Sequence, residues 1–235
     1  MGQILVNFDE ALYADVRLSA EQILWWEQQR REWLAVMRPF SPTAFDATDH
    51  GEVFQKASPI PADLLANARL VWGRERILDE VPQGSIAAEV GVLKGFFTQE
   101  ILRRTNPREL HLFDLDFRPL DACPEFQHHG DSRLLRHLGD SSTELAKLPD
   151  GYFDYIYIDG NHTRSSVARD LDTAARKLKP GGLVQLNDYT PFCYMHLQPY
   201  GVMHAVNDFV ARYHWNVAYF ALHPLGYHDI ALRKP

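Results

Sequence analysis

The chain has 235 residues, of which 46% are apolar and 23% charged; this is the composition of a folded globular protein and excludes a disordered one. Lys and Arg total 24 against 31 Asp and Glu, and the net charge of −7 argues against a nucleic-acid-binding protein, which carries a basic face. No run of about 18 apolar residues occurs, so we expect no membrane-spanning helix and no membrane partner. Two cysteines and no signal-peptide pattern fit a reducing, cytoplasmic location.

Residues 1–82 are predicted to form a helical N-terminal extension. Ser19 and Gln22 have the spacing of a capping box, which marks the start of a first helix. A second helical pattern runs from residue 62 to residue 81 after a polar, aperiodic loop. We expect this extension to act as a lid or to pair two subunits in a homodimer.

Residues 83–235 alternate between strands and helices. Helical patterns separate most of the short apolar runs, which lie at residues 86–92, 110–115, 134–138, 152–159, 182–186, 216–222 and 227–232. Nearly unbroken apolar strands between helices predict a parallel sheet covered on both faces. The last two runs are joined by only four residues, so they must pair antiparallel. The predicted fold class is α/β, a Rossmann-like doubly wound sheet of five parallel strands plus a C-terminal antiparallel hairpin.

The turn after the first of these strands contains Glu89, Gly91 and Gly95. Glycine at such a turn lets the backbone approach a ligand closely. Leu93 stands where a dinucleotide-binding G-x-G-x-x-G motif has its second glycine, which disfavours NAD or FAD. An acidic residue just before Gly91 instead suits a ligand that carries a cationic amine.

Two further strand ends carry residues suited to an adenosine. Asp114 ends the second strand, and either this residue or Asp116 could accept the ribose hydroxyls. Gly139, Asp140 and Ser141 follow the third strand and could meet an adenine edge.

Polar residues also end the next two strands, which would meet at one edge of a parallel sheet. Asp159 ends one strand, and Asn187 and Asp188 end the other. Mg²⁺ prefers oxygen ligands, so Asp159 and Asp188 could hold this ion while Asn187 adds a neutral oxygen. His162 follows Asp159 by three residues and could remove a hydroxyl proton or serve as a metal ligand. The simpler reading is that Asp159 caps its turn and His162 packs under the next helix.

Taken in this order, the motifs resemble a class I S-adenosylmethionine-dependent methyltransferase over roughly residues 85–234. Within that superfamily the chain is most similar to metal-dependent small-molecule O-methyltransferases of the macrocin type, in which the matching histidine is read as the base. Relatives often carry two acids, or Asp then Asn, where this chain has Asn187 and then Asp188. The cofactor-binding residues expected from this resemblance are Glu89, Gly91, Gly95, Asp114, Asp140, Ser141 and Asp159.

The sequence therefore predicts methyl transfer from S-adenosylmethionine to a hydroxyl of a small molecule, a sugar or natural product, assisted by Mg²⁺. His162 and Asp159 are the predicted catalytic residues. Three alternatives stay open: a metal-independent methyltransferase with His162 as base alone, a dehydrogenase, and a non-catalytic cofactor-binding protein that acts through its N-terminal helices.

Overall fold

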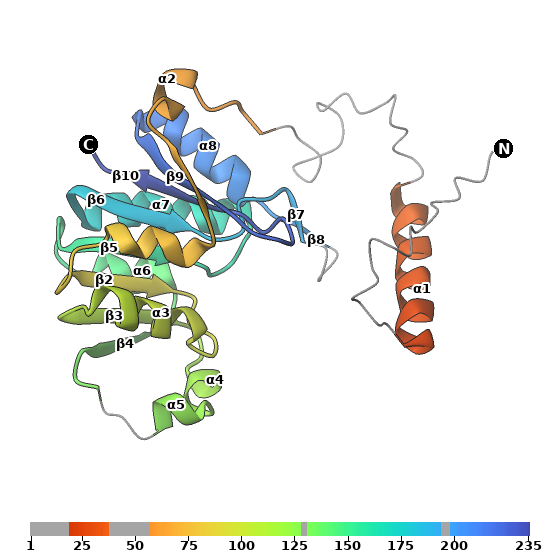
Figure 1. Cartoon of the computed structure of the whole chain (residues 1–235), viewed down its shortest axis with the longest axis horizontal. Coiled ribbons are helices and arrows are strands. Elements are labelled where there is room, and N and C mark those ends of the chain that lie inside the picture. Colours follow the sequence, from red (N-terminus) through yellow and green to blue (C-terminus); the bar gives the residue numbers. More distant parts are fainter. Residues whose placement is uncertain (1–18, 38–56, 128–130, 194–197) are drawn as a thin grey trace. The chain divides into compact units, whose positions relative to one another are not determined.

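The computed structural model describes residues 19–37, 57–127, 131–193 and 198–235. The chain divides into two compact units, residues 1–55 and residues 56–235 (Figure 1). The expected boundary at residue 82 therefore falls inside the larger unit, because the segment just before it contributes a strand to the sheet.

The described part of the smaller unit is one helix, α1 (Ala20–Met37). Its start has the predicted capping box: the Ser19 backbone N–H donates to Oε1 of Gln22 at 2.8 Å, and the Gln22 N–H donates to Oγ of Ser19 at 3.2 Å. These reciprocal bonds satisfy two backbone donors that a helix start leaves without partners. The predicted role of this unit as a lid or dimerisation segment stays a prediction.

The larger unit is built on a mixed sheet that has eight strands within the described residues, in the order β1-β9-β10-β6-β5-β2-β3-β4. Every neighbouring pair is parallel except those of β10, which runs antiparallel to both β6 and β9. The five central parallel strands and the C-terminal hairpin agree with the prediction, whereas β1 was not predicted. The strand bounds are β1 (Arg69–Trp72), β2 (Ile86–Val90), β3 (Glu109–Asp114), β4 (Leu134–Leu138), β5 (Phe153–Ile158), β6 (Leu178–Leu186), β9 (Asn216–Leu222) and β10 (Asp229–Arg233).

The helix predicted over residues 62–81 is wrong. This segment forms α2 (Ala62–Leu65), then β1, then the 3₁₀ helix η2 (Arg74–Glu80). Strand β1 pairs in parallel with β9, with Arg69 opposite Tyr219. The open edge of β9 offers a row of backbone partners, and Gly73 at φ +85° lets the chain turn sharply into η2. Tertiary pairing thus overrides the helical spacing of the apolar residues.

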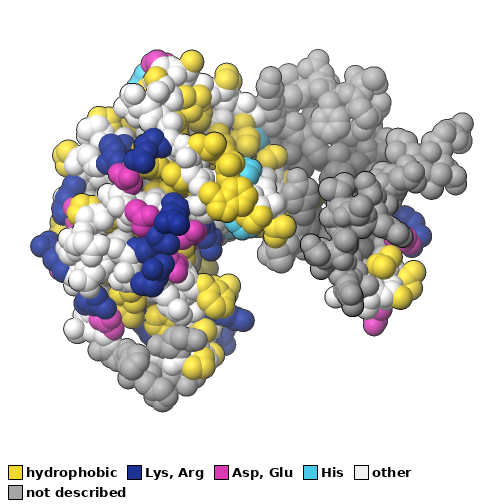
Figure 2. All heavy atoms as spheres, viewed as in Figure 1, with side chains coloured by type: hydrophobic (Ala, Val, Ile, Leu, Met, Phe, Trp, Pro, Cys, Tyr) yellow, Lys and Arg dark blue, Asp and Glu magenta, His cyan; other side chains and the backbone are white. Residues whose placement is uncertain are grey.

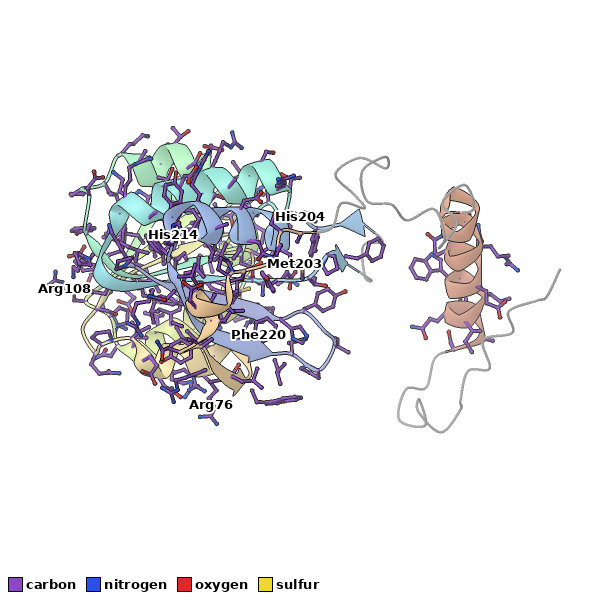
Figure 3. All side chains as sticks on the ribbon, turned by 90° about the horizontal axis from the view of Figure 1, so that it is seen from above. Arg76, Arg108, Met203, His204, His214 and Phe220 are labelled. Atoms are coloured by element: carbon purple, nitrogen blue, oxygen red, sulfur yellow. The ribbon has the colours of Figure 1, made fainter. Side chains whose placement is uncertain are left out.

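Helices cover both faces of this sheet, as Figures 1 and 3 show. Along β5 the side chains alternate: Ile156 and Ile158 belong to one buried cluster, Tyr155 and Tyr157 to the other. The first cluster includes side chains of α6 (Ser141–Ala146), α7 (Arg164–Lys177) and α8 (Val202–Tyr213). The second includes side chains of η2, α3 (Phe96–Thr105) and α4 (Arg118–Asp121). The remaining short elements are α5 (Pro124–Gln127), β7 (Phe192–Cys193) and β8 (Gln198–Pro199).

Acidic and basic side chains are interleaved on the face seen in Figure 2. On η2 and α3, Arg104 pairs with both Asp79 and Glu100, and Arg76 pairs with Asp79. Among the helices in the described ranges, none combines the length and the apolar character that crossing a membrane requires.

Candidate active site

The carboxyl ends of the central strands bring the predicted polar residues to one edge of the sheet. The Asp159 N–H donates to the carbonyl of Val90 at 2.7 Å, and the Asn187 N–H donates to that of Ile158 at 3.0 Å. The ends of β2, β5 and β6 are therefore aligned, as the parallel register requires. Ligands of open α/β sheets bind at such an edge.

Gly91 occupies a turn that no other residue can occupy without a shift. Its φ is +82°, and an added Cβ would lie 2.0 Å from the backbone oxygen of Asp159. Gly95, at φ +74°, is packed instead against the side chains of Leu120 and Phe126, each 2.5 Å from an added Cβ. Because Gly91 has no side chain, the ends of β2 and β5 can lie in contact. Gly95 allows close packing at the start of α3 in the same way.

Glu89 lies under this turn and is 1% exposed. The hydroxyl of Thr98 donates to its carboxyl group at 2.5 Å. Burial raises the pKa of Glu89 to about 8; the Thr98 hydrogen bond opposes this shift and the charge of Asp159 adds to it. The carboxyl group is therefore mainly protonated at pH 7, and a cation placed beside it would favour its ionised form.

Asp114 and Asp116 have different partners. Oδ2 of Asp114 accepts the backbone N–H groups of Val92 at 2.8 Å and Leu93 at 3.1 Å, so this carboxylate braces the turn after β2. The carboxylate of Asp116 is held by the guanidinium of Arg118 at 2.7 Å. Asp114 thus lies beside the turn after β2, and Asp116 is engaged with its own neighbour Arg118.

The side chains of Asp140 and Ser141 make structural contacts after β4. Asp140 is the N-cap of α6 and accepts the Thr143 N–H at 3.0 Å. The Ser141 hydroxyl donates to Asp170 of α7 at 2.6 Å. These bonds engage both side chains in structural contacts, which leaves the backbone of the loop as the part that could meet a ligand.

His162 lies between the two predicted metal-binding carboxylates. Its Nε2 is 3.5 Å from Oδ1 of Asp159 and 3.6 Å from Oδ2 of Asp188. This nitrogen is buried and has no hydrogen-bond partner among the described residues. The ring stacks on Tyr200, with centroids 4.4 Å apart and planes 16° apart. The fold thus brings Asp159, His162 and Asp188 together and holds the imidazole in one plane.

Asn187 makes a contact that the sequence did not suggest. Its Nδ2 donates to the carboxyl group of Asp229 at 3.2 Å, and Gln185 donates to the same group at 2.7 Å. Asp229 begins β10 and is 1% exposed, and burial raises its pKa to about 8. In the sequence, this buried hydrogen-bond network is indicated only by the acidic residue Asp229 within an otherwise apolar strand.

Arg74 is a second unpredicted member of the site. Its Nη1 donates to the hydroxyl of Tyr157 at 2.8 Å and lies 3.6 Å from Oδ2 of Asp159. The guanidinium lies over the ring of Phe97, 5.0 Å from the centroid. No sequence pattern indicated this position of Arg74, because the residue lies outside the strand-end motifs.

A cavity of about 260 Å³ opens beside these residues. It is lined by Arg74, Asn187, Asp188, Cys193, Tyr200, His223 and Tyr227. Within the described residues, no group of three His, Cys, Asp or Glu side chains is arranged to hold a metal ion.

The strand order defines a Rossmann-like α/β domain, and the candidate site lies at the carboxyl ends of its central strands. Residues 88–189 match the sequence model of a family described as a methyltransferase domain. This match covers the strand ends at Glu89, Asp114, Asp159 and Asp188. The match covers less than half of the chain.

Similar solved structures share the fold at low sequence identity. One is a protein of Corynebacterium glutamicum, 18% identical, with a TM-score of 0.53 over 68% of this chain and 79% of the other. Another is an S-adenosylmethionine-dependent methyltransferase from Mesorhizobium loti, 13% identical, with a TM-score of 0.52 over 68% of this chain and 95% of the other.

The curated relatives are named as spermidine and spermine synthases. Spermidine synthase 2 of Datura stramonium is 23% identical over 131 residues, which are 51% of this chain and 41% of the relative. Spermine synthase of Arabidopsis thaliana is 26% identical over 125 residues, which are 47% of this chain and 35% of the relative. The chain thus spans less than half the length of the curated relatives that it matches.

Proposed function

We propose that this enzyme transfers a methyl group from S-adenosylmethionine to a hydroxyl of a small molecule, with His162 as the base. The observation that carries this proposal is the buried Nε2 of His162, which has no hydrogen-bond partner among the described residues. A buried polar atom without a partner is costly, and an acceptor hydroxyl would supply the missing bond.

His162 would accept the hydroxyl proton through Nε2. Asp159 and Asp188, at 3.5 and 3.6 Å, would then stabilise the positive charge that forms on the imidazole. Stacking on Tyr200 keeps the ring in the plane that this transfer requires. Methyl transfer itself needs mainly alignment and removal of the proton.

S-adenosylmethionine, when bound, would supply an electrophilic methyl group. The turn after β2 suits its cationic amine, because the buried Glu89 lies beneath it. Gly91 leaves room for the ligand against the backbone, and the carboxylate of Asp114 lies where ribose hydroxyls could be accepted. Asp140 and Ser141 would contribute mainly through their backbone.

We propose Asp159 and Asp188 as the two carboxylates that would hold an assisting Mg²⁺ ion, with water and substrate completing its coordination, because the described residues form no group of three ligands. This ion is usually held by one or two carboxylates plus water and substrate, and Asp159 and Asp188 flank the unpartnered nitrogen of His162. When bound, Mg²⁺ would lower the pKa of the acceptor hydroxyl. Asn187 could add only its carbonyl oxygen, because its Nδ2 donates to Asp229. A metal-independent reaction with the same base is the alternative.

The test is formation of S-adenosylhomocysteine with a panel of small hydroxyl compounds, measured with Mg²⁺ and with EDTA. We expect activity in the wild type and a loss of about 100-fold or more in His162→Gln. Loss of activity in EDTA supports the metal, and full activity in EDTA supports the metal-independent reaction. Cofactor binding without transfer to any acceptor would instead indicate a non-catalytic protein.

A further inference from the structure

The cavity beside the site contains a cationic group that the proposed methyl transfer does not use. The guanidinium of Arg74 carries about five N–H donors, and among the described residues only its Nη1 makes a hydrogen bond, to the hydroxyl of Tyr157 at 2.8 Å. The other donors have no hydrogen-bond partner among the described residues. The side chain is 34% exposed and lines the cavity, so these donors are available to a ligand.

His223 adds a neutral donor to the same wall. Its Nδ1 accepts the backbone N–H of Leu225 at 3.2 Å, so the proton of the neutral ring lies on Nε2. Burial, together with the charge of Arg74, lowers the pKa of His223 and keeps the ring neutral at pH 7. The cavity lining thus contains one cationic fork and one neutral N–H donor.

The carboxylates of Asp159 and Asp188 restrict where an anionic group of the methyl acceptor could bind. Asp188 also lines the cavity and would repel an anion placed beside it. Asp159, 3.6 Å from Nη1 of Arg74, neutralises part of the guanidinium charge without a hydrogen bond to it, and Oδ2 of Asp159 accepts a hydrogen bond from the Tyr157 hydroxyl at 3.3 Å. An anionic group is therefore favoured only at the free donors of Arg74, away from Asp188.

The size of the cavity also restricts the acceptor. At about 260 Å³, the cavity lies just below the range of about 300–1,000 Å³ that is typical of pockets for drug-sized ligands. This volume suits a compound of one small ring or a short chain.

We propose that the cavity binds the carboxylate of a small hydroxy acid through Arg74 and His223, so that its hydroxyl lies at His162. This inference rests on the proposed function and names the substrate class of that site. A guanidinium binds a planar carboxylate through two parallel N–H bonds, which a neutral amide cannot match.

Calorimetry tests the inference without turnover. The 235-residue chain is titrated first with S-adenosylhomocysteine, and the saturated protein is then titrated with the three hydroxybenzoates, with lactate and with mandelate. Each acid is compared with its amide and with the amine in which the carboxylate is reduced to an aminomethyl group. We expect at least one acid to bind about 10-fold or more tightly than its amide and its amine.

Variants of Arg74 test whether this residue binds the carboxylate of the acid. Arg74→Gln should remove the preference for the acid, and Arg74→Lys should keep part of it, because lysine retains the charge but not the fork. The matched control is Arg69→Gln on β1, which pairs with Glu80 outside the cavity and should keep the full preference. Thermal unfolding checks that each variant is folded, and the lysine variant keeps the test valid if glutamine destabilises the site.

The outcomes separate the two proposals. If S-adenosylhomocysteine does not bind, the proposed function and this inference both fail. If it binds and no acid binds more tightly than its amide and amine, or if Arg74→Gln retains the preference, only this inference is overturned.

Discussion

Nε2 of His162 lies 3.6 Å from Oδ2 of Asp188, although the two residues follow different strands and are separated by helix α7. This proximity depends on the parallel register of β5 and β6, which aligns Ile158 with Leu186. The pairing of β5 and β6 thus brings the candidate base close to Asp188, although the two residues are far apart along the chain.

Tyr200 is expected to position the base through ring stacking. Tyr200→Ala removes the surface on which His162 lies and should lower kcat by about 10-fold, because a misplaced catalytic group loses alignment. Tyr200→Phe is the control, since it keeps the ring. Steady-state kinetics with an acceptor that the wild type methylates makes the comparison. Equal kcat for the alanine and phenylalanine variants would rule out this role.

The metal proposal predicts a measurable ion site. Mn²⁺, followed by its electron paramagnetic resonance signal, should bind the wild type, and the Asp159→Asn plus Asp188→Asn double variant should bind at least about 10-fold more weakly. Asp63→Asn on α2 is the control for an exposed carboxylate distant in sequence from the site. Equal affinity in the double variant would exclude these two residues as the ligands.

A side chain at Gly91 should destabilise the fold through a steric clash, in addition to the strain of its positive φ. Gly91→Ala places Cβ 2.0 Å from the Asp159 oxygen, whereas Gly151→Ala, at φ +64°, has no neighbour within 4 Å. Both variants carry the strain of a positive φ, about 1 kcal/mol, but only the first forces β2 and β5 apart. Urea unfolding should show a clearly larger loss for Gly91→Ala, and equal losses would contradict the close approach.

Glu89 should make stability depend on pH. Its pKa is about 8 in the folded chain and near 4.5 when unfolded, so between these values the folded state binds more protons. The free energy of unfolding therefore falls as pH rises from 4.5 to 8, with a contribution of up to roughly 1.4 kcal/mol per pH unit.

Glu89→Gln removes this contribution and retains an acceptor for Thr98. Compared with the wild type, the variant should gain stability at pH 8 relative to pH 6, as measured by urea unfolding at both values. Glu144→Gln on α6 should leave the wild-type dependence unchanged. If Glu89→Gln follows the wild type at both pH values, Glu89 is not held protonated by burial.

Regular periodicity explains which elements could be predicted from the sequence. The strand at Asn216–Leu222 was predicted with the bounds that the structure has, because it carries an apolar pattern with a clear stop. Asp159 and Asp188 could be paired in advance because parallel strands must end at one edge.

The unpredicted residues depend on contacts that local pattern does not encode. Arg74 reaches the site because β1 pairs with the edge strand β9, which places the start of η2 next to Tyr157. Asp229 reaches it because β10 inserts antiparallel between β6 and β9. Neither placement follows from spacing along the chain, since both depend on which strand edge remains open.

Binding of the cofactor tests the central claim most directly. Calorimetric titration of the full chain with S-adenosylmethionine should show one site, and Asp114→Asn should weaken it, because this carboxylate braces the turn after β2 and lies beside the expected ribose. The matched variant Asp116→Asn should bind like the wild type, because Asp116 is engaged with Arg118. The account predicts binding that depends on Asp114; a wild-type chain that binds neither S-adenosylmethionine nor S-adenosylhomocysteine would contradict it.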